Sequence, residues 1–318
     1  MLALCGASVR AGTRGPMHTL FSARRLLALA VLVCASAQAN DSSFGDDNGT
    51  IRLLHQPDIS MDKEVLFLSE ERVQVDYVFT NNSERDLSVP VAFPMPPMYF
   101  GMADHSELTD FKLWADGKPI ATTRKLVVLL DDGSDISKAF AATGWTQDDV
   151  AAFTESGTPP KGRKPLPARW VDADAQPRFT LNEYFVWQQA FPARRSVQIR
   201  HAYAPSLSTG VPQPSTYLLE SYAKDTCIEP GTKTSMQRRE GQSGLAWANL
   251  RYVLTTGKNW NGPIKDFQLT IRKQAASDIL SLCFEGELKK IDPLTFQFTQ
   301  ANFVPMRDLN ILFVRAPD

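Results

Sequence analysis

Histidine and cysteine are scarce in this sequence of 318 residues, and its net charge is close to zero. It holds 4 His and 4 Cys, too few for a multi-zinc protein or a dense disulfide scaffold, and no close His pair or His-Glu-x-x-His pattern points to a zinc hydrolase. A formal charge of −1 gives no basic field to attract a phosphate backbone. No Gly-rich phosphate loop is present. We therefore predict no nucleic-acid partner and no cofactor.

The chain also lacks an apolar run of about 20 residues, the length that a membrane-spanning helix needs. Its longest apolar run, over residues 26–34, follows two arginines and precedes small residues at positions 37 and 39. This order is typical of a secretory signal peptide. We predict such a peptide over residues 1–39, starting at Met1 or Met17 and cleaved after Ala39, which places the protein in the periplasm. A retained membrane anchor is the alternative; no transmembrane span is expected in the mature chain.

Cleavage after Ala39 would leave two cysteines, Cys227 and Cys283. In an oxidising compartment a free pair of thiols tends to join, so we predict one disulfide between them. Closing that loop would remove denatured-state entropy worth roughly 4 kcal/mol in the chain-entropy model. Two separately buried thiols are the alternative.

Apolar and polar residues alternate with a period of two along much of the chain, as in half-buried strands. Residues 73–79 and 87–93 indicate two antiparallel strands joined by a turn, and Pro90 places the second at an edge or bonded on one side only. Further strands are predicted over residues 179–191, 197–203, 250–255, 267–272, 279–284, 295–299 and 309–314. The predicted fold class is mainly β, an antiparallel β-sandwich architecture of two packed sandwiches, or one elaborated sandwich, with a small helical insertion.

Residues 133–157 interrupt this rhythm with helix signals. Thr146 can cap a helix, and Gly144 and Gly157 can end helices. We predict an N-terminal β-sandwich over residues 40–206 with a helical insertion at about 133–157. Residues 207–318 are predicted as a C-terminal β-rich region. Many Pro, Ser, Thr and Gly over residues 204–244 suggest a long irregular loop there, tethered by the disulfide.

Five stretches in order along the chain resemble the DUF4424 family of bacterial exported proteins of unknown function. They are Asn-Asp-Ser-Ser at 40–43, the strand at 73–81, Val-Ala-Phe-Pro-Met-Pro at 91–96, the run at 183–192 and the run at 252–267. The resemblance implies a periplasmic or cell-envelope protein, and it supplies no activity and no catalytic residues. The strand order also resembles the β-sandwich of VIT-type domains, a likeness of fold alone.

Candidate catalytic side chains are few. His201 alternates with apolar neighbours on one strand face, which favours a hydrogen-bonded core histidine over a catalytic one. A periplasmic hydrolase is the alternative function, and it would require His201, Glu183 or Asp266 to converge in one cleft. We assign no catalytic, cofactor-binding or metal-binding residue.

Carbohydrate recognition is a further alternative. It requires exposed, stacking aromatic rings, and the candidates are Trp187, Trp247 and Trp260. In a β-sandwich most tryptophans lie in the core or at a seam, which is the competing interpretation.

The run over residues 93–100 is the most unusual short segment. Prolines impose extended geometry on it, and its methionines and aromatics could form an adaptable contact surface. The candidate interaction surface consists of Phe93, Met95, Met98, Tyr99 and Phe100; a plug at the end of the sandwich is the alternative. We expect an exported, non-catalytic binding or assembly protein of the periplasm or cell envelope, with an envelope protein or glycan as partner.

Overall fold

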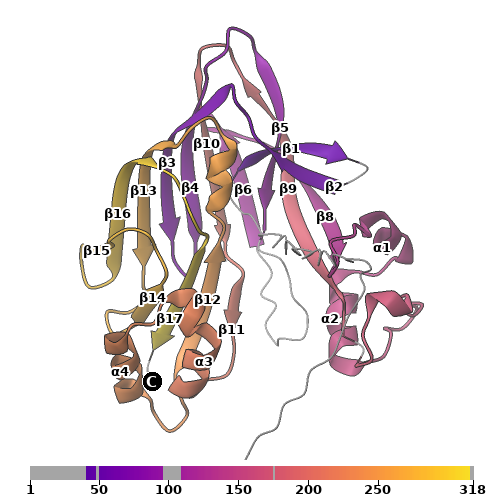
Figure 1. The fold of residues 1–318 in the computed structure, drawn as a ribbon, viewed down its shortest axis with the longest axis vertical. Coiled ribbons are helices and arrows are strands. Elements are labelled where there is room, and N and C mark those ends of the chain that lie inside the picture. The colour runs from indigo at the N-terminus through magenta and orange to yellow at the C-terminus, as the bar shows by residue number, and fades with distance from the viewer. Residues whose placement is uncertain (1–40, 48–49, 96–108, 175, 316–318) are drawn as a thin grey trace, which may run out of the picture. The chain divides into compact units, whose positions relative to one another are not determined.

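The computed structural model describes residues 41–47, 50–95, 109–174 and 176–315. The chain divides into two compact units, Met1–Ala35 and Ser36–Asp318. The first unit, and with it the predicted signal peptide, lies outside the described residues. The second unit is mainly β, with three sheets and four α-helices among its described residues (Figure 1). The predicted fold class, with its helical insertion, is confirmed.

Each sheet combines strands from distant parts of the chain, named below in their spatial order. The five-stranded sheet contains β2 (Thr50–Leu54), β1 (Ser42–Asp47), β5 (Leu87–Pro94), β9 (Phe179–Phe191) and β8 (Thr123–Leu130). The eight-stranded sheet contains β15 (Lys289–Lys290), β16 (Thr295–Phe303), β13 (Ile264–Arg272), β3 (Ile59–Leu68), β4 (Val73–Asn81), β10 (Ser196–Ala204), β6 (Thr109–Ala115) and β7 (Lys118–Pro119). The four-stranded sheet contains β11 (Leu207–Thr209), β12 (Ala246–Tyr252), β17 (Leu309–Arg315) and β14 (Ile279–Leu282).

Six helical segments connect these strands in the described part of the chain. They are α1 (Ser137–Thr143), α2 (Gln147–Ser156), the 3-10 turn η1 (Ala168–Trp170), α3 (Ser215–Thr226), α4 (Pro230–Arg239) and the 3-10 turn η2 (Thr255–Asn259).

One strand pair joins the two halves of the sequence. β13 pairs with β3 in parallel, in a register that runs from Asp266 opposite Lys63 to Ile271 opposite Leu68. The sheet is therefore mixed rather than purely antiparallel. Because strands from both sides of residue 206 share this sheet, the predicted boundary between residues 206 and 207 does not separate two sheets.

The predicted pairing of the strands at 73–79 and 87–93 is wrong, although both strands exist. β4 lies in the eight-stranded sheet and β5 in the five-stranded sheet. Their inward residues face each other across the core instead of lying side by side, and alternation alone does not distinguish these two arrangements. Pro90 lies beyond the short β1 pairing and opposite Gln188 of β9, so its strand is bonded there on one side only, as predicted.

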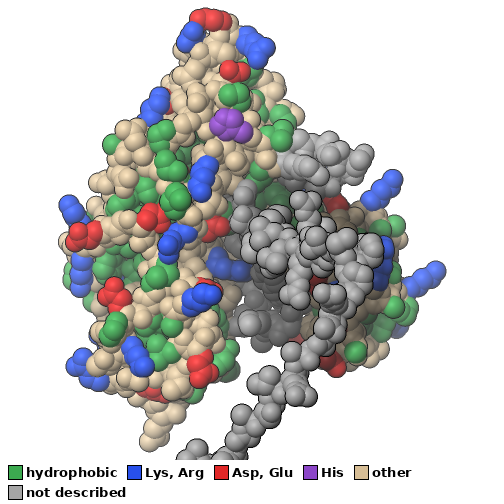
Figure 2. All heavy atoms as spheres, viewed as in Figure 1, with side chains coloured by type: hydrophobic (Ala, Val, Ile, Leu, Met, Phe, Trp, Pro, Cys, Tyr) green, Lys and Arg blue, Asp and Glu red, His purple; other side chains and the backbone are tan. Residues whose placement is uncertain are grey.

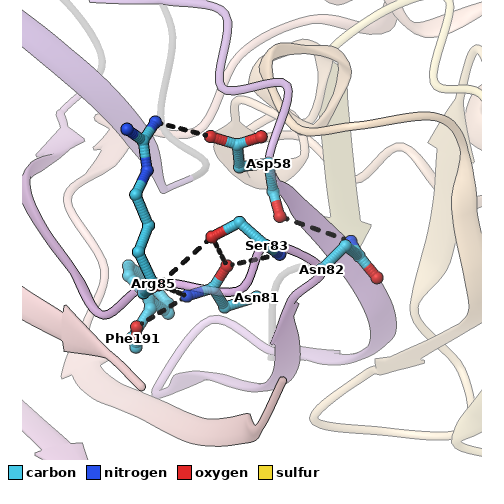
Figure 3. A network of polar contacts seen from close by, with 6 residues as sticks. All are labelled: Asp58, Asn81, Asn82, Ser83, Arg85 and Phe191. Carbon is cyan, nitrogen blue, oxygen red and sulfur yellow. Dashed lines mark hydrogen bonds and ion pairs between the residues drawn. The ribbon is translucent and has the colours of Figure 1, made fainter. Parts of the chain in front are cut away.

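A polar network shapes the chain where it crosses from β4 to β5 (Figure 3). The fully buried Asn81 amide donates to the carbonyl oxygens of Arg85 and Phe191, each at 2.8 Å. Its oxygen accepts from the backbone N–H of Ser83 at 2.9 Å and from the Ser83 hydroxyl at 2.8 Å. Arg85 also forms an ion pair with Asp58 at 3.4 Å. Buried polar groups need such partners, so the hydrogen bonds of Asn81 hold the path of the chain between β4 and β5.

The main core draws on all three sheets. Inward side chains from β3, β4, β10 and β13 meet those from β5, β9, β12 and β17. Aromatic pairs span these layers, with ring centroids 4.1 Å apart for Phe111 of β6 and Phe185 of β9 and 6.1 Å apart for Phe79 of β4 and Phe191 of β9. Burial of these large rings is the main source of stability for such a fold.

The helical insertion has a small core of its own, centred on Phe140, Trp170 and Phe179. Along the chain the insertion follows β8 and precedes β9, and its helix α1 contacts β8 (Figure 1). Helix α2 begins at the predicted cap: the Thr146 hydroxyl accepts from the N–H of Asp149, whose carboxylate accepts from the N–H of Thr146. Such a capping box satisfies backbone donors that the helix leaves free.

The irregular loop predicted over residues 204–244 is wrong, since this region contains α3 and α4. Pro230 is tolerated because it occupies the first turn of α4, where its missing N–H would have no helical partner. Leu218 and Met236 anchor the two helices in a core formed with β12 and β17. Cys227 ends α3 and bonds to Cys283, with 4.9 Å between the Cα atoms. The predicted disulfide is confirmed.

Candidate functional site

The three candidate catalytic residues do not come together. His201 on β10 points into the core, whereas Asp266 on β13 forms a surface ion pair with Lys63 at 3.0 Å. β3 and β4 separate these two strands, a distance of roughly 14 Å at the usual strand spacing. Glu183 lies in the five-stranded sheet, where it pairs with Arg124. No shared cleft forms from these residues.

His201 instead belongs to a closed polar contact. Its Nε2 lies 3.1 Å from Oδ2 of Asp41, and both side chains are 0% exposed. Four aromatic rings surround the imidazole, with centroid separations from 4.9 to 5.7 Å: Tyr77, Phe93, Phe111 and Trp187. Burial raises the pKa of Asp41, and the neighbouring His201 opposes that rise. Because both side chains are sealed from solvent, the pair acts within the fold rather than on a substrate.

Further polar groups lie in the same core. The hydroxyls of Tyr77 and Tyr252 lie 3.3 Å apart, and Glu64 is fully buried. Burial holds the pKa of both tyrosines well above the ordinary range, and the nearby Glu64 carboxylate adds to the effect. Both tyrosines therefore stay protonated at neutral pH.

The predicted interaction surface is placed only in part. Phe93 is 0% and Met95 is 7% exposed, so these two side chains belong to the main core. Phe93 lies on β5 and Met95 directly after it, and with Val89 and Val91 they occupy the alternate positions that face the core. Met98, Tyr99 and Phe100 lie outside the described residues.

The predicted stacking tryptophans are buried as well. Trp187, Trp247 and Trp260 are each at most 8% exposed. Their indole N–H groups donate within the protein, for example from Trp260 to the carbonyl oxygen of Asp41 at 2.7 Å. They serve as core and seam residues.

A concave surface does lie on the outward side of the eight-stranded sheet. Val65, Asp76, Arg200 and Trp114 are neighbours in register on β3, β4, β10 and β6. They line a depression of about 570 Å³, in which Arg200 forms an ion pair with Asp76 and Trp114 is half-buried. The depression thus combines an apolar floor, an aromatic ring and a fixed pair of charges, as many ligand sites do.

Two smaller depressions adjoin this one. One of about 380 Å³ shares Arg72 and Trp114 with it, and another of about 420 Å³ shares Glu71 and Arg72 with the second. Arg72 lines all three. We call the three depressions together the outer groove.

One feature of the sequence marks the outer groove: apolar residues at outward positions of its strands. Outward positions of a sheet face solvent and are usually polar, yet Val65, Phe67, Val78 and Trp114 occupy such positions in this protein and are only half-buried. Charge gives no comparable signal. On the face seen in Figure 2, basic and acidic side chains are interspersed over the described residues.

The part of the chain that the structure describes contains neither a metal-binding cluster nor a membrane-spanning helix. No group of three or more His, Cys, Asp or Glu side chains in the described ranges could hold a metal ion. Among these same residues, no helix is long and apolar enough to cross a membrane.

Fold and groove together define a mainly β protein with an open groove on one sheet face. The chain belongs to the DUF4424 family, described as a domain of unknown function, whose model matches residues 39–312. No curated protein matches the chain.

Solved structures match the chain at low identity. One, from Legionella pneumophila subsp. pneumophila str. Philadelphia 1, is named a "putative nutrient binding protein"; it is 13% identical with a TM-score of 0.47, over 87% of this chain and 70% of that one. An M1 zinc metallopeptidase from Deinococcus radiodurans is 11% identical with a TM-score of 0.26, over 82% of this chain and 43% of that one. Neither likeness indicates what this chain binds.

Proposed function

We propose that the protein is an exported, non-catalytic binding protein of the bacterial periplasm or cell envelope, and that it binds its ligand in the outer groove. The observation that carries this proposal is the conjunction of Trp114, the Arg200–Asp76 pair and the half-buried Val65 in one open depression of about 570 Å³. An aromatic ring beside fixed hydrogen-bonding groups gives both contact area and orientation.

Binding accounts for this groove better than hydrolysis does. Asp76 is the single carboxylate among the described residues that line the depression of about 570 Å³, and it is engaged by Arg200. In the adjoining depressions Asp110 is paired with Lys112, which leaves Glu71 as the one carboxylate of the groove without an ion-pair partner among the described residues. General acid–base hydrolysis of a glycoside would need two carboxylates at a defined separation. His201 is sealed in the core and Glu183 lies in another sheet.

Two features support export. Residues 24–39 have the order of a signal peptide, with basic residues, a short apolar run and small residues at the cleavage site. The Cys227–Cys283 bond is of the kind that persists in oxidising compartments. Both fit a periplasmic location.

The groove is tested with the mature, disulfide-bonded chain, residues 40–318, against a library of envelope saccharides and small metabolites. Binding is followed by isothermal calorimetry. We expect Trp114→Ala to abolish binding and Tyr217→Ala, an exposed aromatic on α3, to leave it unchanged. Binding that survives Trp114→Ala, or a library without any hit, would overturn the groove as the ligand site.

Export is tested separately, by fractionation of cells that produce the full chain. A periplasmic product that has lost residues 1–39 is expected. An intact chain in the cytoplasm would refute this part of the proposal.

A further inference from the structure

Two arginines line one end of the outer groove. Arg72 lies in the turn between β3 and β4, where the N–H of Ser69 donates to its carbonyl oxygen at 2.9 Å. Arg272 is the last residue of β13. Because β13 and β3 are parallel, their final residues reach the same edge of the sheet, and both arginines line the depression of about 420 Å³.

Neither guanidinium is neutralised by a carboxylate. Arg72 donates to the side-chain oxygen of Gln74 at 2.6 Å, and within the described residues no carboxylate lies within ion-pair distance of Arg72 or Arg272. The pKa of Asp292 is lowered mainly by hydrogen bonds within its own turn, and Arg272 contributes least to that shift. A guanidinium has five N–H donors, so most of those on Arg72 are left for a ligand. Both arginine side chains are exposed, which keeps the cost of desolvation small.

The other cations near the groove are already engaged. Arg200 pairs with Asp76, Lys63 with Asp266 at 3.0 Å, and Lys112 with Asp110 at 2.7 Å. Lys273, beside Arg272, donates to the carbonyl oxygens of Ala276 at 3.0 Å and Asp278 at 2.6 Å.

The two arginines therefore outweigh one acidic group in the depression they line. Glu71 is its acidic member, and it is exposed. A planar guanidinium binds carboxylate and phosphate oxygens in a bidentate manner. An anionic group of a ligand is the natural partner for this end of the groove.

The rest of the groove is suited to a different part of the ligand. Phe67 lies in the depression with the two arginines, and Trp114 lies in the two depressions beyond it. Aromatic faces stack on apolar ring surfaces. Gln198, Asp76 and Arg200 line the same depression as Trp114 and can exchange hydrogen bonds with hydroxyl groups. A sugar ring offers both an apolar face and a hydroxyl edge.

We propose that the outer groove binds an acidic saccharide, with its carboxylate or phosphate held by Arg72 and Arg272 and a sugar ring stacked on Trp114. This assignment rests on the proposed binding function and names its ligand class. It also accounts for the lack of a carboxylate partner at these two arginines, whose charges the ligand would neutralise.

The test compares two probes of equal length, trigalacturonic acid and its neutral counterpart galactotriose, by isothermal calorimetry on the mature chain. We expect the acidic probe to bind at least tenfold more tightly, and its affinity to fall as salt concentration rises. Arg72→Gln with Arg272→Gln should remove this preference. Arg238→Gln, an exposed arginine on α4, is the matched control and should change nothing.

The outcomes separate the ligand class from the binding function. Equal affinity for the two probes would overturn the acidic-saccharide assignment, and so would an acidic preference that survives the double arginine change. In either case, binding that is lost in Trp114→Ala would still support the groove as the ligand site. Binding of an acidic peptide but of neither saccharide would also overturn the acidic-saccharide assignment. If neither the library nor either probe shows binding that depends on Trp114, the proposed function itself is refuted. Circular dichroism of each variant checks that the fold is retained.

Discussion

The buried Asp41–His201 pair gives the sharpest prediction about stability. Replacing His201 by Leu leaves the Asp41 carboxyl fully buried among aromatic rings without the imidazole 3.1 Å away. Loss of one partner of a buried polar contact typically costs about 1 to 3 kcal/mol, because the remaining group loses a partner and cannot be solvated. We expect a loss of about 3 kcal/mol, at the upper end of that range, since the Asp41 side chain is fully buried.

A double-mutant cycle isolates the interaction. Asp41→Asn replaces the carboxyl group at nearly constant volume, and in the presence of His201→Leu it should cost little more, because the imidazole contact is then already lost. We therefore expect a coupling free energy of about 2 kcal/mol between the two changes. The assay is urea unfolding of the mature chain, followed by tryptophan fluorescence. Single-mutant costs that add to within about 0.5 kcal/mol would refute a direct interaction.

The pH dependence of the same pair has a definite sign. Burial raises the pKa of Asp41 in the folded state, so the folded protein holds this proton more tightly than the unfolded chain does. The contribution of Asp41 to stability must then decline as pH rises from the ordinary aspartate pKa through the raised value. Asp41→Asn should remove this decline from the curve of unfolding free energy against pH. A wild-type curve that keeps the same slope in the variant would contradict the assignment.

Three further predictions concern other parts of the fold. Replacing Cys227 and Cys283 by Ser should lower the free energy of unfolding by about 4 kcal/mol, since the bond closes a separation of 56 residues, and a urea midpoint that does not move would refute this. Asn81→Asp should cost about 3 kcal/mol or more in the same assay, because an ionised carboxylate cannot donate to the two carbonyl oxygens that Asn81 serves; equal stability of Asn81→Asp and wild type would contradict the network in Figure 3. Thr146→Ala should cost about 1 kcal/mol through loss of the α2 cap, with the exposed Thr158→Ala as control, and equal urea midpoints for the two would argue against the cap.

Local signals in the sequence carried much of the secondary structure. The alternation over residues 179–191 and 197–203 predicted β9 and β10, and the cap residues Thr146 and Gly157 predicted the limits of α2. Each of these depends on neighbours a few residues away. Pairing does not, because β3 and β13 meet across nearly two hundred residues of chain, and nothing in either strand specifies that partner.

The same distinction explains why the candidate site was only partly predictable. Phe93 and Met95 drew attention as an unusual apolar run, yet an apolar run is equally suited to a core, and both side chains lie on the face of the sheet that covers the core. Trp114 and Arg72 are unremarkable singly, since exposed tryptophan and arginine occur on most proteins. They become parts of one groove because β6 and the β3–β4 turn bring them to the same depressions of one sheet face. Residue identity supplied the chemistry of the groove, and only the order of strands in the sheet could supply its location.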